Sequence, residues 1–132
     1  MKVRRMNKTI SFVFIIAVIA LSACSRNNDS ASWNRKGNAL YREGRYAEAI
    51  NCYDKAIEIY PESFNAWIGK ADILKAMDRH AEAIKCYEKA IEIYPESFTA
   101  WTSKADTLRA MGRYEEASEC YIKAKGIERE KR

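Results

Sequence analysis

The chain has 132 residues, which is enough for one modest domain, and a formal net charge of +5. Four of its 23 basic residues (Lys2, Arg4, Arg5 and Lys8) lie near the N-terminus, and residues 24–132 hold 19 basic and 18 acidic residues, interleaved in sequence. A nucleic-acid surface needs clustered cations, and beyond residue 23 only the short Lys131-Arg132 tail offers any. The charge pattern therefore argues against nucleic acid as a partner.

Residues 1–23 have the three-part layout of a secretory signal. A cationic stretch over residues 2–8 is followed by twelve mostly apolar residues, Ile10 to Leu21, and then by the small residues Ser22 and Ala23. The apolar run is short for a membrane-spanning helix, which needs about 20 residues. We therefore expect the segment to be cleaved.

Leu21-Ser22-Ala23-Cys24 resembles the lipobox of bacterial lipoproteins. The resemblance implies that residues 1–23 are removed as a signal peptide and that Cys24 is lipidated. It also implies that the protein is anchored to the cell membrane or an outer membrane and faces outside the cytoplasm. Residues 25–32 are polar, rich in Ser and Asn and without an apolar period, so residues 24–29 are predicted to form a flexible tether. The alternatives are an ordinary signal peptide with a cysteine near its cleavage site, and an uncleaved anchor.

An internal repeat of 34 residues fills the rest of the chain: Trp33, Trp67 and Trp101 are spaced by that number, and Glu48 to Trp67 matches Glu82 to Trp101 at 17 of 20 positions. The period and its key residues resemble the tetratricopeptide repeat (TPR). The residues that carry the resemblance are Trp33, Gly37, Ala49, Tyr53, Ala56 and Pro61; Trp67, Ala71, Ala83, Tyr87, Ala90 and Pro95; and Trp101, Ala105, Ala117, Tyr121 and Ala124.

The resemblance implies an all-α fold, a right-handed solenoid of three helix-turn-helix repeats over residues 30–63, 64–97 and 98–131. Small residues such as Gly37 and Ala49 are expected where the two helices of a hairpin cross. We expect Gly44, Asp78 and Gly112 in the hairpin turns, since these residue types tolerate a left-handed backbone. Asp29, Ser63 and Ser97 are suited to cap the first helix of each repeat.

The third repeat is predicted to form a polar, self-capping end that completes the array. Three positions of each second helix are expected to pack on the next repeat, and only the third repeat is polar at all of them. The positions are Ala47, Ile50 and Ile57 in the first repeat, Ala81, Ile84 and Ile91 in the second, and Glu115, Ser118 and Lys125 in the third. Tyr121, Ile122 and Ile127 stay apolar, so weak self-association is a further possibility.

Neither catalysis nor cofactor binding has candidate groups in this sequence. Cys52, Cys86 and Cys120 occupy equivalent positions that a packed repeat would hold roughly 10 Å or more apart, too far for a disulfide. We interpret them as small buried residues, and His80, which stands where other repeats have tyrosine, as a packing substitution. The sequence predicts no enzyme activity, no metal site and no cofactor.

Stacked TPR hairpins form a concave groove lined by the first helix of each repeat, and resemblance to family members with peptide grooves implies another protein as partner, bound as a peptide or a helix. The lining predicted here is Asn34, Asn38, Tyr41, Arg42, Ile68, Asp72, Lys75, Thr102, Asp106 and Arg109. Asp72 and Lys75 are an i, i+3 pair, as are Asp106 and Arg109, so we expect these charges to neutralise each other in part.

The groove matches the carboxylate clamp of chaperone-binding TPR proteins only at Asn38, which disfavours a chaperone partner. The leading hypothesis is a membrane-tethered interaction scaffold of the cell envelope. One alternative is an envelope protein that binds a small ligand or glycan through Tyr41, Tyr60 and Tyr94. Another is a solvated helical face without a specific ligand.

Overall fold

A computed structural model describes residues 28–132, so the predicted signal and Cys24 lie outside the described residues. The described part is built from α-helices. They are α2 (Ser30–Arg42), α3 (Tyr46–Ile59), α4 (Phe64–Ala76), α5 (His80–Ile93), α6 (Phe98–Ala110) and α7 (Tyr114–Glu130). None of these helices is long and apolar enough to cross a membrane.

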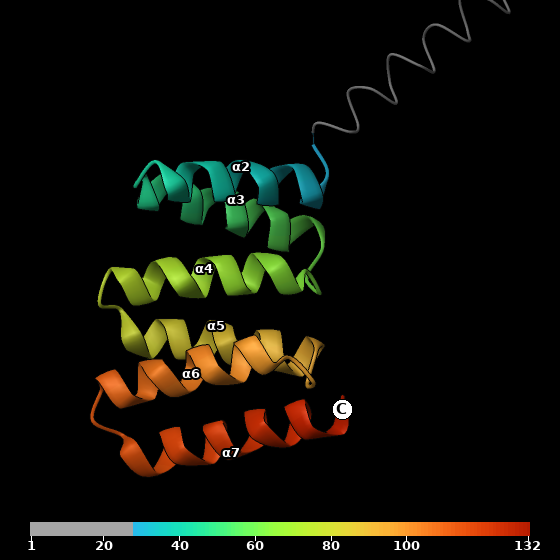
Figure 1. The fold of residues 1–132 in the computed structure, drawn as a ribbon. Helices are drawn as coiled ribbons and strands as arrows, with labels where there is room; N and C mark the ends of the chain where they lie inside the picture. The colour runs from blue at the N-terminus through green and yellow to red at the C-terminus, as the bar shows by residue number, and fades with distance from the viewer. Residues whose placement is uncertain (1–27) are drawn as a thin grey trace, which may run out of the picture.

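The helices form three antiparallel hairpins stacked along one axis, from α2 and α3 at one end to α6 and α7 at the other (Figure 1). Contacts run between consecutive helices and also between α2 and α4, the first helices of neighbouring hairpins. The predicted all-α solenoid of helix-turn-helix repeats is therefore confirmed.

The three hairpin turns use left-handed backbone at the predicted positions. Gly44 and Gly112 have φ of +75°, and Asp78 has φ of +59°. Glycine adopts this region without steric cost, and aspartate is among the few other residues that tolerate it. One such residue in each turn lets the chain reverse within three residues between helices.

Two of the three predicted N-caps form. Asp29 accepts a hydrogen bond from the Ser32 amide at 2.6 Å, and the Ser97 hydroxyl accepts one from the Ala100 amide at 3.2 Å. Ser63 stands at the N-cap of α4 without a side-chain cap bond. Its Oγ instead lies 3.5 Å from Nδ2 of Asn34, on α2. The prediction for Ser63 was wrong because a contact with a residue of α2 takes the place of the local bond.

A buried tyrosine on the second helix of the first repeat fixes the distance between hairpins. Tyr53 of α3 has no exposed surface. A Cβ added at Gly37 would lie 2.8 Å from its ring, and one added at Gly69 would lie 2.4 Å from it. The ring therefore occupies the space that side chains at both glycines would fill, one in its own repeat and one in the next.

Ion pairs also join successive repeats. Asp54 on α3 pairs with Lys70 on α4 at 2.6 Å, and Glu88 on α5 pairs with Lys104 on α6 at 2.9 Å. Each pair links the second helix of one repeat to the first helix of the next at equivalent positions. The pairs thus define a stacking contact that recurs with the repeat.

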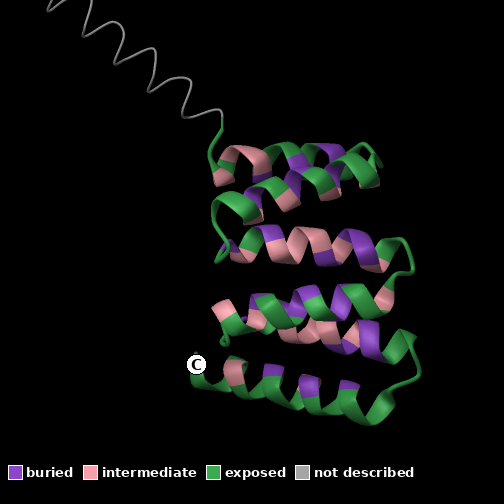
Figure 2. Cartoon of the chain, turned by 180° about the vertical axis from the view of Figure 1, so that it is seen from behind, coloured by how far each residue is buried: buried purple, intermediate pink, exposed green. Residues whose placement is uncertain are grey.

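The expected packing between repeats is confirmed at Ile50 and Ile84 and wrong at Ala47 and Ala81. Ile84 is buried in the cluster of the third repeat, and Ile50 packs against two clusters. Ala47 and Ala81 are exposed, because their position faces solvent in the first turn of the second helix. Glu115, Ser118 and Lys125 are exposed on α7, whose outer side is open along its length (Figure 2).

Replacing Gly69 with alanine tests the seating of Tyr53. We expect Gly69→Ala to lower the free energy of unfolding by about 1–3 kcal/mol, since a buried ring hydrogen-bonded at its hydroxyl has no room to move. Gly126→Ala is the matched control, because a Cβ there meets nothing within 4 Å, and it should stabilise the dilute protein by up to about 1 kcal/mol. Denaturant unfolding followed by circular dichroism measures both, and equal effects at the two glycines would contradict the packing described.

Candidate partner-binding groove

A depression of about 410 Å³ lies between α2 and α4. Residues of both helices form its walls, and Tyr53 of α3 contributes to its floor. The lining is Ala31, Asn34, Arg35, Asn38, Tyr41, Tyr53, Asn65, Ile68, Gly69 and Asp72. Gly69 is part of this lining because Tyr53 excludes any larger side chain there. The packing that spaces the two repeats therefore also shapes the depression.

Hydrogen bonds from the second-helix tyrosines fix one residue of the first helix in each repeat. The Tyr53 hydroxyl donates to Oδ1 of Asn38 at 2.5 Å, and that of Tyr87 donates to Oδ1 of Asp72 at 2.5 Å. Tyr121 makes the equivalent bond to Asp106. Three predicted groove residues thus have an internal partner, which orients their side chains and uses part of their bonding capacity.

Burial dominates the electrostatics of these pairs. It raises the pKa of Tyr53 to about 12, and it raises the pKa of Tyr87 as well, reinforced by the hydrogen bond to Asp72. It also raises the pKa of Asp72, against the lowering effect of the Tyr87 hydrogen bond. Burial therefore disfavours the charged form of both groups, the Tyr87 hydroxyl and the Asp72 carboxyl.

Asn34 supplies a polar group whose bonding is incomplete. Its side chain is 9 % exposed, and its Oδ1 has no hydrogen-bond partner within residues 28–132. An unpaired buried polar atom costs roughly 1–3 kcal/mol. Two more carboxamides line the depression, Asn38 and Asn65, the latter exposed. The site therefore concentrates side chains that both donate and accept hydrogen bonds.

The structure brings half of the predicted groove residues into this depression. Asn34, Asn38, Tyr41, Ile68 and Asp72 line it. The other five, Arg42, Lys75, Thr102, Asp106 and Arg109, do not belong to its lining. Those of the third repeat lie on α6, beyond the helices that form the depression.

The expected ion pairs form only in part. Arg109 lies 3.7 Å from Asp106, as predicted. Asp72 instead takes the Tyr87 hydroxyl as its partner, and Lys75 only lowers its pKa by charge attraction. The charge of Lys75 thus offsets that of Asp72 in part, as expected, but helical spacing alone does not reveal the tyrosine donor from the next helix.

Sequence reasoning missed the other half of the lining, which is Ala31, Arg35, Tyr53, Asn65 and Gly69. Arg35 and Asn65 are three residues before Asn38 and Ile68, so the helical period could have placed them on the same faces. For Gly69 the signal was a glycine where the next repeat has Ser103.

The tyrosines of the glycan alternative do not gather in one site. Tyr41 lines the depression and lies near the turn that follows α2, while Tyr60 is the C-cap residue of α3, at the opposite end of the hairpin. Tyr94 caps α5 and packs edge-on against Phe64, with ring centroids 5.8 Å apart. A single aromatic platform built from these three residues is therefore not formed.

The cysteines of the described residues are buried thiols. Cys52, Cys86 and Cys120 are free and buried, and burial raises the pKa of the Cys86 and Cys120 thiols. Within residues 28–132, no group of three or more His, Cys, Asp or Glu side chains is placed to hold a metal ion.

These features define a protein of stacked helical hairpins with a polar depression between the first helices of its first two repeats. Comparison with known proteins gives the family. One tetratricopeptide-repeat family model matches residues 28–96, more than half of the chain, and a second matches residues 86–117. The chain belongs to the tetratricopeptide-repeat family.

Individual proteins are similar to this chain either in the sequence of a short segment or in the fold. A TPR repeat-containing thioredoxin, TTL4 of Arabidopsis thaliana, is 43 % identical over 44 residues, which are 33 % of this chain and 6 % of that protein. The crystal structure of MamA superposes with a TM-score of 0.77 at 25 % identity, over 80 % of this chain and 61 % of that one. The chain thus spans less than two thirds of either relative.

A further fold match is the first TPR domain of Spaghetti (RPAP3), solved with the HSP90 peptide SRMEEVD. Its TM-score is 0.72 at 23 % identity, over 75 % of this chain and 79 % of that one. At this identity the match shows the shared fold.

Alkaline titration tests the buried tyrosine bonds. Above pH about 10 the unfolded chain releases a phenolic proton that folded Tyr53 retains until pH about 12. The free energy of unfolding should therefore fall with rising pH over this interval. Tyr53→Phe should reduce that slope, with Tyr60→Phe, which removes an exposed hydroxyl, as the matched control. Denaturant unfolding at stepped pH measures it, and an unchanged slope in Tyr53→Phe would refute the assignment.

Proposed function

We propose that this protein is an interaction scaffold that binds an extended segment of another protein in the depression between α2 and α4. The observation that carries the proposal is the gathering of Asn34, Asn38 and Asn65 around that depression. Carboxamide side chains donate and accept at once, so they match the alternating N–H and C=O groups of a peptide backbone.

The remaining lining indicates the character of the bound segment. Ile68 and Tyr41 offer apolar surface, with Tyr41 38 % exposed and packed beside Tyr46. Arg35 and Asp72 bring one charge of each sign. Because these charges offset each other, we expect a segment without a strong net charge that inserts one or two apolar side chains.

The fold neighbours support peptide binding as a use of such a groove but not the same ligand. The Spaghetti (RPAP3) TPR domain was solved with an acidic peptide of HSP90. The carboxylate clamp of chaperone-binding TPR proteins has other residues at four positions of the present groove. These positions hold Asn34, Gly69, Thr99 and Ser103. The proposed partner is therefore of another class.

Membrane attachment is a second part of the proposal. The Leu21-Ser22-Ala23-Cys24 sequence supports cleavage before Cys24 and lipidation of its thiol. Residues 24–29 would then join the anchor to α2, since Asp29 caps that helix. A span of six residues reaches at most about 22 Å when extended, so the groove would work close to the membrane surface of the cell envelope.

Site-directed photo-crosslinking in the native host tests the groove. A photoreactive residue at position 65 in the full-length chain should give a small number of defined adducts, and Ile68→Ala should reduce them several-fold by removing apolar contact. Position 51 is the matched control, because Asn51 is also an exposed asparagine but lies on α3, outside the depression. The same adducts at both positions, or none at position 65, would count against groove binding.

Mass spectrometry of the native N-terminus tests the anchor. We expect residues 1–23 to be absent and Cys24 to carry acyl chains, and Cys24→Ser should move the protein from the membrane fraction, because the acyl chains supply the binding energy. An intact Met1, or membrane retention of Cys24→Ser after cleavage, would overturn this part of the proposal without affecting the groove.

A further inference from the structure

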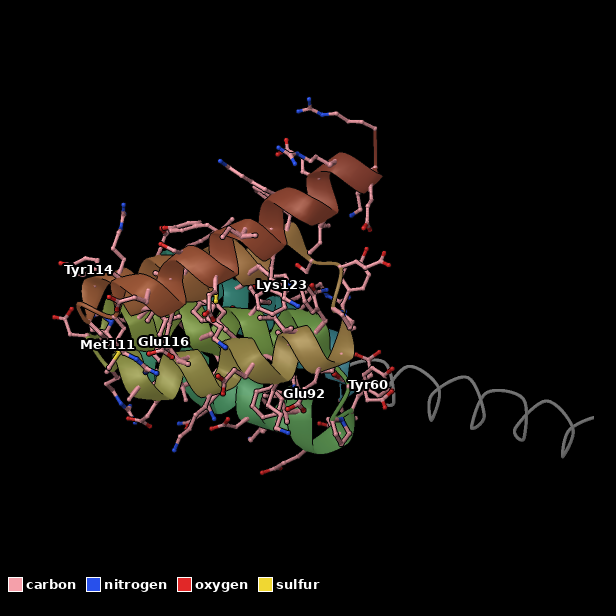
Figure 3. All side chains as sticks on the ribbon, turned by 90° about the horizontal axis from the view of Figure 1, so that it is seen from below. Tyr60, Glu92, Met111, Tyr114, Glu116 and Lys123 are labelled. Atoms are coloured by element: carbon pink, nitrogen blue, oxygen red, sulfur yellow. The ribbon has the colours of Figure 1, made fainter. Side chains whose placement is uncertain are left out.

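The outer side of α7 carries a narrow stripe of four residues with two apolar members at its centre. Glu119, Ile122, Gly126 and Arg129 follow one another at intervals of 3, 4 and 3 residues, which puts them on one face of the helix. All four are exposed, Ile122 by 70 %. Glu119, Ile122 and Gly126 also border a shallow depression of about 530 Å³. Figure 3 views the molecule from this side, with α7 nearest the reader and Lys123 labelled on it.

Every member of the stripe differs from its counterparts in the first two repeats. The counterparts are Asn51, Asp54, Glu58 and Pro61 on one repeat and Lys85, Glu88, Glu92 and Pro95 on the other. Asp54 and Glu88 form the ion pairs that stack one repeat on the next. Ile122 stands where those carboxylates stand, so this face lacks the acid that the recurring contact uses. The surface is therefore suited to a different neighbour.

No contact within the hairpin explains why residue 126 is a glycine. It lies inside α7, where glycine is about 1 kcal/mol less favourable than alanine. An added Cβ would meet nothing within 4 Å, in contrast to the crowded Gly37 and Gly69. A glycine on an open helix face lets another backbone approach closely.

The charges at the ends of the stripe are unpaired within the described chain: neither Glu119 nor Arg129 forms an ion pair with another residue of 28–132. Around them, the first turns of α7 carry Glu115 and Glu116, and its end carries Lys131 and Arg132. The first end of the helix is thus acidic, and the other end, where Glu128 and Glu130 offset part of the positive charge, is weakly basic.

The spacing of the stripe is symmetric, because the intervals of 3, 4 and 3 residues are the same in both directions along the helix. We propose that it binds a second copy of this chain, with the two α7 helices packed antiparallel about a twofold axis. Reversal places Glu119 opposite Arg129 of the second copy and Ile122 opposite Gly126 of the second copy. Each contact then occurs twice, as an isologous interface requires. The isoleucine fills the space that the glycine leaves open.

Pairing through α7 leaves the depression between α2 and α4 free on both copies, so the inference does not depend on what the groove binds. A dimer would present two grooves to one partner assembly. Two linked sites raise apparent affinity without new contacts.

Charge reversal separates this interface from ordinary helix stabilisation. Sedimentation equilibrium of the full-length chain in density-matched detergent should show a monomer–dimer equilibrium. Glu119→Arg and Arg129→Glu should each weaken it by about tenfold, since each places like charges together twice. The double variant should restore most of the association. Residues 119 and 129 are too far apart on one helix to pair, and both changes oppose the helix dipole, so rescue has no source within one chain.

Gly126→Leu provides a second, independent variant. It should weaken the dimer by at least about tenfold while leaving the helical circular dichroism signal and thermal unfolding of the dilute protein intact. Ala39→Leu, at an exposed position of α2, adds a leucine side chain elsewhere and should not change association. A chain that stays monomeric at every concentration overturns the proposal and assigns the stripe to a different partner. A dimer that Gly126→Leu and the charge reversals leave unchanged also overturns it, and assigns association to another surface.

Discussion

The buried tyrosine of the second helix is the contact on which the rest of this structure depends. Tyr53 has no exposed surface, it excludes side chains at Gly37 and Gly69, and its hydroxyl bonds Asn38. A single side chain thus joins the two helices of its own repeat and the first helix of the next. Because interiors pack at near-crystalline density, the spacing of the hairpins follows from this ring. The depression between α2 and α4 is the surface consequence.

The same repeat explains which features the sequence could predict. The period of 34 residues, the small residues at the helix crossing and the left-handed turn at Gly44 are local or self-repeating signals, and each has the predicted place in the fold. These features depend on the spacing of residues along one hairpin.

Contacts between separate helices could not be predicted in the same way. Ser63 has the residue type of a helix cap, but its hydroxyl lies near Asn34 on α2, and Asp72 of α4 accepts a hydrogen bond from Tyr87 of α5 in preference to pairing with the lysine one turn away. Both outcomes depend on how one helix is rotated against another, which no helical period encodes. For the same reason, only half of the residues that line the groove were predicted. Its first-helix face follows from periodicity, but its limits depend on where α4 lies against α2.

Departures from the repeat are the most informative positions in a chain so strongly duplicated. A residue that all repeats share serves the fold, whereas a residue that differs in a single repeat needs a reason local to that repeat. Gly69 differs from Ser103, and beside Tyr53 position 69 has no room for a Cβ. Ile122 and Gly126 differ from both earlier repeats, and nothing within the hairpin accounts for an exposed isoleucine beside an uncrowded glycine. Because α7 is exposed along that face, a second copy of the chain, which the symmetric spacing of the stripe fits, would give both residues a neighbour.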